Sequence, residues 1–271
     1  IGGAKFTLNG VTYELAKNSA EVNNLHSGPD YYRDRIWDAE VEETALGTTI
    51  TFGLHSPDGD QGYPGNADIT VSYTLTPDNC LKLDYHMVSD ADTIANFTNH
   101  VYFNLGGYKS GSALDQKVWI DADYFTATDA NSIPTGELVA VKGTPMDFTE
   151  MKPIGRDIQE DYQALKYGNG YDHNWALNHP AGELSLSAKA EDEKTGRTME
   201  VYTDLPGVQF YTANSLKTEH GKNHAVYTPR CGYCFETQYF PDAINKPEFA
   251  SPVIKAGEEY KTTTIYKFGV K

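Results

Sequence analysis

The sequence predicts an all-β protein, built as one large antiparallel β-sandwich. Short stretches in which apolar and polar residues alternate recur along the chain, as in half-buried strands. The composition, with 19 Tyr, 24 Gly and 13 Pro in 271 residues, favours strands joined by turns. Only residues 157–165 have a plausible helical face, and it is short. Because we find no repeat and no linker-like break, we expect a single domain over residues 1–271.

The expected strands follow in chain order. Residues 5–8 and 11–15 alternate on either side of Asn9-Gly10, and Asn-Gly between such runs is the strongest short hairpin signal. Residues 69–75 and 81–88 form a second pair around a proline-containing turn. Further strands are expected in the C-terminal half, at residues 184–188, 199–202, 208–212 and 260–268. Long polar loops, where binding residues usually lie, separate these strands at residues 23–35, 56–66, 106–112 and 159–174.

Charge and cysteine content exclude several classes of function. The chain has 22 basic and 38 acidic residues, a net charge of −16, which would repel nucleic acids and anionic membranes. We therefore expect no nucleic-acid and no membrane partner. Three Cys residues exclude a disulfide scaffold and favour a reducing, cytoplasmic compartment. No stretch approaches the roughly 18 apolar residues of a membrane span.

Two motifs could suggest metal or redox chemistry, but a purely structural role is favoured for both. Cys231 and Cys234 form a C-x-x-C motif, yet only Cys80 remains to complete a zinc site, and no βαβ pattern surrounds the motif. We expect structural thiols. His220 and His224 have the spacing of a helical metal pair, but an intervening glycine favours a loop.

Four segments each combine a residue capable of proton transfer or sugar binding with aromatic or amide residues: residues 23–28, 96–105, 170–175 and 234–241. Glu236 lies in an otherwise apolar strand, where burial would raise its pKa toward that of a general base. A strand-end Glu on an exposed face, or one in a structural ion pair, is the alternative. Residues 96–105 resemble a strand, with His100 and Tyr102 on one face. His100 is either a core imidazole held by its Asn neighbours or the acid partner of such a base. These residues alone predict a β protein that handles a sugar or polyol, and they leave the reaction open.

At these segments the sequence strongly resembles the aldose 1-epimerase, or galactose mutarotase, family. The matching motifs occur in the family's order and spread over nearly the whole chain: Asn24-Leu25-His26-Ser27-Gly28, residues 56–65, Asn99-His100-Val101-Tyr102-Phe103-Asn104-Leu105, Tyr171-Asp172-His173, residues 206–211 and Glu236-Thr237-Gln238-Tyr239-Phe240-Pro241-Asp242.

The resemblance implies the galactose mutarotase-like supersandwich fold and the interconversion of α and β anomers of free aldoses such as galactose and glucose. It implies that Glu236 takes a proton from the C1 hydroxyl while His100 protonates the ring oxygen, with no metal and no cofactor. It also implies four substrate-binding residues, namely His26, Tyr102, Asp172 and Gln209; His26 is in addition a second possible proton partner.

Two departures from the family pattern stand out. Ser27 replaces the first of two glycines that usually follow the histidine of the His26 loop. The family also has a substrate-binding arginine and further β structure before the position of Ile1, so we expect this chain to be N-terminally incomplete. Three alternatives stay open: a hexose-6-phosphate epimerase of the same fold, a non-catalytic sugar-binding module, and the mutarotase part of a fused protein.

Overall fold

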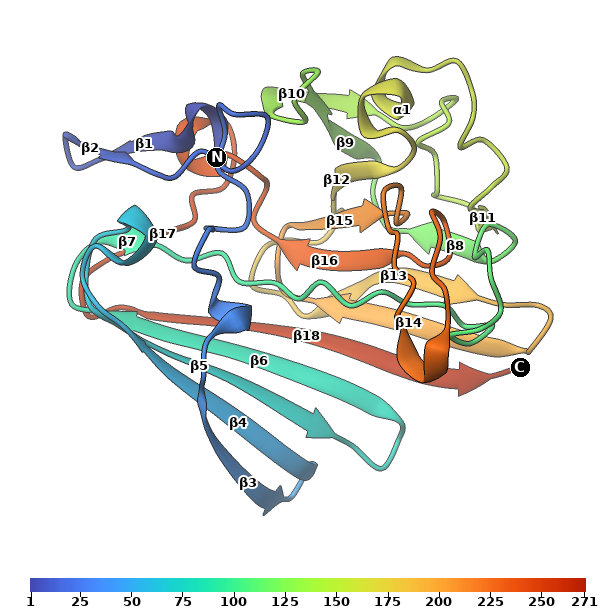
Figure 1. Cartoon of the computed structure of the whole chain (residues 1–271), viewed down its shortest axis with the longest axis horizontal. Coiled ribbons are helices and arrows are strands. Elements are labelled where there is room, and N and C mark those ends of the chain that lie inside the picture. The colour runs from blue at the N-terminus through green and yellow to red at the C-terminus, as the bar shows by residue number, and fades with distance from the viewer. The chain divides into compact units, whose positions relative to one another are not determined.

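The computed structural model describes all 271 residues and consists almost entirely of antiparallel strands (Figure 1). The chain forms two compact units. The first contains Ile1–Phe97 and Pro241–Thr264, and the second contains Thr98–Phe240 and Ile265–Lys271. The long strand β18 (Glu259–Val270) begins in the first unit and ends in the second. The all-β prediction is confirmed, while the expectation of a single domain stays a prediction.

In the first unit, four strands pair in the order β6-β5-β4-β3. A hairpin, β1-β2, and a short pair, β7-β17, accompany them. The strands are β1 (Lys5–Leu8), β2 (Val11–Glu14), β3 (Asp38–Thr44), β4 (Gly47–Ser56), β5 (Ala67–Leu75), β6 (Cys80–Ser89), β7 (Thr93–Ile94) and β17 (Val253–Ile254). Four 3₁₀ turns lie at Gly2–Ala4, Tyr32–Asp34, Asp60–Gly62 and Ala243–Asn245.

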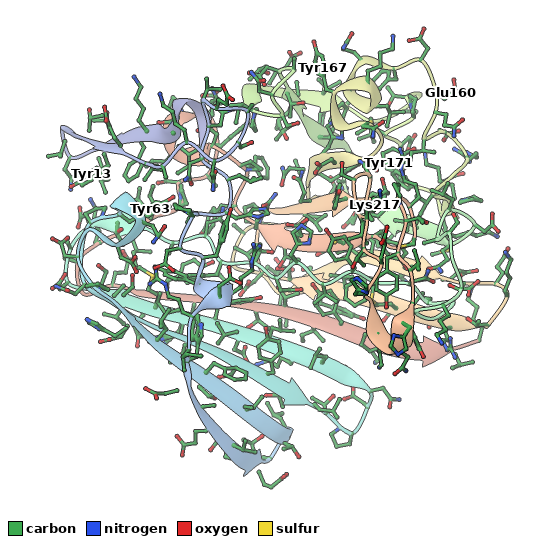
Figure 2. All side chains as sticks on the ribbon, viewed as in Figure 1. Tyr13, Tyr63, Glu160, Tyr167, Tyr171 and Lys217 are labelled. Carbon is green, nitrogen blue, oxygen red and sulfur yellow. The ribbon has the colours of Figure 1, made fainter.

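A small apolar cluster holds the β1-β2 hairpin in this unit. Phe6 is buried and stacks on Tyr13 and Tyr63, with ring centroids 5.1 and 5.6 Å apart. Figure 2 labels both tyrosines next to the hairpin. The turn residues Asn9 and Gly10 both have positive φ, as a two-residue hairpin turn requires.

The second unit contains a five-stranded sheet, in the order β10-β9-β12-β15-β16, and four strands in the order β11-β8-β13-β14. The two sets lie one above the other in Figure 1. The strands are β8 (Lys117–Ile120), β9 (Tyr124–Thr128), β10 (Pro134–Ala140), β11 (Lys152–Pro153), β12 (Asp172–Ala176), β13 (Ser185–Glu191), β14 (Arg197–Thr203), β15 (Gly207–Tyr211) and β16 (Cys234–Gln238). A 3₁₀ turn lies at Lys222–His224, so the predicted loop around His220 and His224 is confirmed.

The helix prediction is wrong in its position. The only α-helix, α1, spans Gln163–Gly168, whereas residues 157–162 form turns. Lys152 and Arg156 both bind the Asp157 carboxylate, which holds the start of the expected helix in this irregular path. The helix is six residues long, and no helix in the structure has the length and hydropathy that crossing a bilayer requires.

An aromatic cluster forms the core beneath one face of the five-stranded sheet. Phe210 is fully buried, and its ring centroid lies 5.2 to 6.1 Å from those of five other aromatic side chains: Phe148, Tyr171 (labelled in Figure 2), Trp175, Tyr233 and Phe235. Interiors pack at crystal density, so a side chain removed here leaves a cavity that its neighbours cannot fill.

We expect Phe210→Ala to lower the free energy of unfolding by about 3–5 kcal/mol, the usual cost of truncating a buried Phe. Urea unfolding followed by tryptophan fluorescence measures this loss. Phe268→Ala is the matched control, because Phe268 is 36% exposed whereas Phe210 is fully buried, and it should cost far less. Equal losses at the two positions would contradict the assignment of Phe210 to the centre of the core.

Candidate active site

The candidate site lies on one face of the sheet formed by β12, β15 and β16. The antiparallel register places Asn174 opposite Gln209, and Gln209 opposite Glu236, in one row across the three strands. Asp172 pairs with Tyr211 in the next row. Since alternate residues of a strand share a face, both rows point to the same side of the sheet.

The two faces of this sheet differ sharply in chemistry. The face that carries the rows above is polar, with two carboxylates, three amides, a phenol and a thiol: Asp172, Glu236, Asn174, Gln209, Gln238, Tyr211 and Cys234. The opposite face is apolar and buried, and carries Trp175, Val208, Phe210 and Phe235. His173 belongs to this opposite face, between the rings of Phe125 and Trp175, and burial lowers its pKa to about 4. Residues of β12, β15 and β16 alternate between the two faces, so the pattern that places apolar side chains in the core also places the polar side chains together on the other face.

His100 faces Glu236 across this polar surface. Nε2 of His100 lies 3.6 Å from Oε1 of Glu236, slightly beyond hydrogen-bond distance. The imidazole is 33% exposed and the Glu236 side chain only 8%. A proton donor or acceptor that reaches solvent thus stands beside a carboxylate that hardly does, which is a suitable arrangement for moving one proton in and one proton out.

The electrostatic environment makes Glu236 an unusual carboxyl group. Burial raises its pKa to about 8, and the negative charge of Asp172 adds to the increase. Burial also raises the pKa of Asp172, to about 6, although a hydrogen bond from Gln209 opposes the shift. Carboxyl groups with pKa values this close to neutrality are typical of acid–base sites, because each can gain and lose a proton near pH 7.

A chain of amides orients Asp172. Gln238 Nε2 donates to Gln209 Oε1 at 3.2 Å, and Gln209 Nε2 donates to Asp172 Oδ1 at 2.8 Å. Gln238 also donates to Asn174 Oδ1 at 3.1 Å, while the buried Nδ2 of Asn174 has no partner. These amides fix which atoms of the site donate and which accept hydrogen bonds, as recognition of a polyhydroxylated ligand requires.

Two tyrosines stand beside the imidazole. The ring centroid of His100 lies 5.0 Å from that of Tyr102 and 5.9 Å from that of Tyr211. Tyr102 is 43% exposed, and burial of its hydroxyl raises its pKa, so the hydroxyl stays protonated at neutral pH. An apolar ring with a polar tip can contact both the C–H face and the hydroxyls of a ligand.

Five of the six site residues predicted from the sequence belong to the second unit: His100, Glu236, Tyr102, Asp172 and Gln209. His26 belongs to the first unit, on an exposed turn with left-handed backbone (φ 55°).

The prediction of a strand around His100 is wrong, because residues 95–102 do not belong to any strand. Phe103, which forms one isolated bridge with Tyr233, is the only residue of this segment that pairs with a strand-like partner. An extended segment without a partner strand can bend, and this freedom lets His100 face β16.

Four residues of the polar face were missed from the sequence: Asn174, Tyr211, Gln238 and Cys234. Each lies two residues from a predicted site residue on the same strand, so period-two alternation around Asp172, Gln209 and Glu236 would have found them. Cys231 and Cys234 are free thiols, as the C-x-x-C interpretation predicted, and the buried Sγ of Cys234 lies 3.3 Å from Nδ1 of His100.

An antiparallel β protein whose polar sheet face carries an imidazole opposite a buried carboxyl group has the features of an acid–base enzyme, and comparison with known proteins makes this class specific. The family model described as "Aldose 1-epimerase" matches residues 1–267, and the chain belongs to this enzyme family. Galactose mutarotase from Bos taurus is 41% identical over 271 residues, which are 100% of this chain and 76% of that protein. Aldose 1-epimerase from Escherichia coli is 34% identical over 270 residues, covering 99% of this chain and 76% of that protein.

A solved structure supports the same relation. The crystal structure of galactose 1-epimerase from Lactobacillus acidophilus matches with a TM-score of 0.87 at 27% sequence identity, and the match covers 100% of this chain and 76% of that chain. The expected galactose mutarotase-like fold is therefore confirmed.

Proposed function

We propose that the chain interconverts the α and β anomers of free aldohexoses such as galactose and glucose by acid–base ring opening and reclosure. The single observation that carries this proposal is the His100–Glu236 pair on the polar face of β12, β15 and β16. Mutarotation needs one group that removes a proton and one that supplies a proton, and it transfers no electrons or chemical groups.

The proposed mechanism uses both members of the pair twice. Glu236, ionised, removes the proton from the C1 hydroxyl while His100 donates a proton to the ring oxygen, so that the C1–O5 bond breaks and an aldehyde forms. Rotation about the C1–C2 bond exposes the other face of the aldehyde. The C5 hydroxyl then attacks this face, returns its proton to His100, and C1 oxygen regains a proton from Glu236. Both groups end in their starting states.

Asp172, Gln209 and Tyr102 are proposed to bind the sugar. A hydrogen bond from Gln209, which is itself held by Gln238, keeps the Asp172 carboxylate in place and favours its use as a fixed acceptor for sugar hydroxyls. Tyr102 offers an exposed ring face beside His100. His26 stays a proposed substrate-binding residue on the sequence resemblance alone.

Anomer exchange of freshly dissolved α-galactose and α-glucose, followed by polarimetry or NMR against buffer alone, tests the proposal. We expect faster exchange with the protein than without it. Binding of either sugar without acceleration would instead establish a non-catalytic sugar-binding module. Glucose 6-phosphate serves as a third substrate, and we expect it to be poor because the polar face carries two carboxylates and no Lys or Arg to bind a phosphate.

The raised pKa of Glu236 predicts how the rate of anomer exchange depends on pH. Because a general base must be ionised, kcat/KM is expected to rise with pH as Glu236 loses its proton near pH 8. Asp172→Asn removes the charge that adds to this high pKa, so the rise should move to lower pH even though sugar binding weakens. A pH–rate profile of both proteins measures the shift, and an unmoved or opposite limb would contradict the coupling of the two carboxyls.

We also propose that the protein works in the cytoplasm. All three cysteines are free thiols, which agrees with a reducing compartment. Fractionation of cells that produce the protein tests this location.

A further inference from the structure

The buried thiol of Cys234 contacts the His100 imidazole on the side opposite Glu236. Cys234 lies on β16 two residues before Glu236, so the thiol and the carboxylate share one face of the strand. Its side chain is completely buried, and Sγ lies 3.3 Å from Nδ1 of His100. The other ring nitrogen, Nε2, is the one that faces Glu236 at 3.6 Å. The two nitrogens therefore meet different partners, a thiol on one side and a carboxyl on the other.

We infer that Cys234 is a positioning residue, whose sulfur accepts a hydrogen bond from Nδ1–H of His100 and so keeps Nε2 as the nitrogen that gives and takes the mobile proton. This inference rests on the proposed function. A neutral imidazole has one N–H donor and one bare nitrogen, and the hydrogen bond at one nitrogen decides the state of the other. An Nδ1–H that donates to the sulfur keeps one proton on Nδ1. The imidazolium can then give its Nε2 proton to the ring oxygen, and the neutral ring that remains has a bare Nε2, which can take the proton back.

A thiol suits this position because it is a weak donor and also a weak acceptor. Burial raises the pKa of Cys234, so the group is a neutral S–H near pH 7. Nδ1 keeps its proton whether His100 carries one proton or two, so the same hydrogen bond to the sulfur holds the orientation of the ring in both protonation states. A carboxylate here would favour the charged imidazolium and hinder its release of a proton. The thiol leaves His100 able to give and to accept a proton with similar ease, as a reversible ring opening requires.

Three other site residues meet different parts of the imidazole. Tyr102 and Tyr211 meet the imidazole through their rings, and Glu236 faces Nε2. Replacing the thiol at position 234 therefore tests one contact of the ring at a time.

The experiment combines kinetics with side-chain ¹⁵N NMR of His100. We expect neutral wild-type His100 to be mainly the Nδ1–H tautomer, and Cys234→Ala to shift the population toward Nε2–H. Loss of one weak hydrogen bond should lower kcat roughly three- to tenfold with little change in KM. Cys234→Ser retains an acceptor at this position and should restore most of both properties. Cys231→Ala is the matched control, because Cys231 belongs to the same C-x-x-C motif but lies only half-buried and outside the polar face.

Two outcomes would overturn the inference: an Nε2–H tautomer of neutral His100 in the wild type, or an unchanged tautomer and unchanged kcat in Cys234→Ala. Should the Ala variant fail to fold, the wild-type tautomer and the Ser variant still decide the question. Failure of the proposed function has a different signature, namely no acceleration by the wild type or no loss in Glu236→Gln.

Discussion

Glu236→Gln should slow catalysed anomer exchange of α-galactose by between about 10² and 10⁴, the usual contribution of a general base. The amide keeps the shape of the carboxyl group but cannot take the proton from the C1 hydroxyl. NMR exchange between the two anomeric protons measures the rate directly. Sugar affinity should change little by comparison, because the substitution removes a proton acceptor but keeps the size and shape of the side chain.

Glu191→Gln is the matched control for this substitution. Glu191 is buried to a similar extent in the same unit, but it lies on β13 and pairs with Lys271. The Glu191 variant is expected to keep the wild-type rate even where it loses stability. If Glu191→Gln slowed exchange as much as Glu236→Gln does, the effect would be structural and the role of Glu236 as base would be refuted.

The same Glu236→Gln substitution should stabilise the fold at alkaline pH. In the unfolded chain the carboxyl ionises near its ordinary value of 4.5, whereas in the folded protein it keeps its proton up to about pH 8. Between these values the folded state binds more protons, so the wild type loses stability as pH rises. Gln does not titrate. Thermal melts at pH 4 and pH 8.5 should therefore show a stability gain that is larger at pH 8.5, and the opposite trend would contradict the raised pKa.

Local sequence signals predicted those strands whose partners lie next to them in the chain. Asn9-Gly10 specified the β1-β2 hairpin, and alternation located the β5-β6 and β13-β14 pairs within two or three residues of their observed bounds. In each case the turn and the alternating pattern agree, so local preference and tertiary pairing reinforce each other.

The failures have physical causes. The segment around His100 alternates like a strand, but strand formation needs a partner, and only Phe103 has one. Residues 157–165 carry apolar side chains at helical spacing, yet Lys152 and Arg156 bind Asp157 and the first turns stay irregular. Both outcomes depend on distant contacts that periodicity cannot report.

The candidate site divides in the same way. Glu236 drew attention because a carboxylate in an apolar strand requires a reason, and its raised pKa agrees with that argument. Cys234 gave no such signal, since a buried thiol among apolar residues is ordinary. Its contact with His100 arises because residues 134 positions apart in the sequence meet on one sheet face. The sequence therefore identified Glu236, whose residue type is unusual in an apolar strand. Only the structure identified Cys234, whose residue type is common there.

His100→Gln should slow exchange by a factor similar to that for Glu236→Gln, between about 10² and 10⁴, because the ring oxygen then lacks its proton donor. His179→Gln is the matched control, since His179 contacts Ser187 and lies outside the polar face.

The double variant, Glu236→Gln with His100→Gln, is the sharper test. Ring opening needs a proton removed at C1 and a proton supplied at the ring oxygen in the same step, so the loss of either group already disables the pair. The double variant should then be no more than a few-fold slower than the slower single variant, as for residues that act as one unit. Losses that multiply would show instead that the two groups act independently, and that the facing geometry of His100 and Glu236 is not the basis of catalysis.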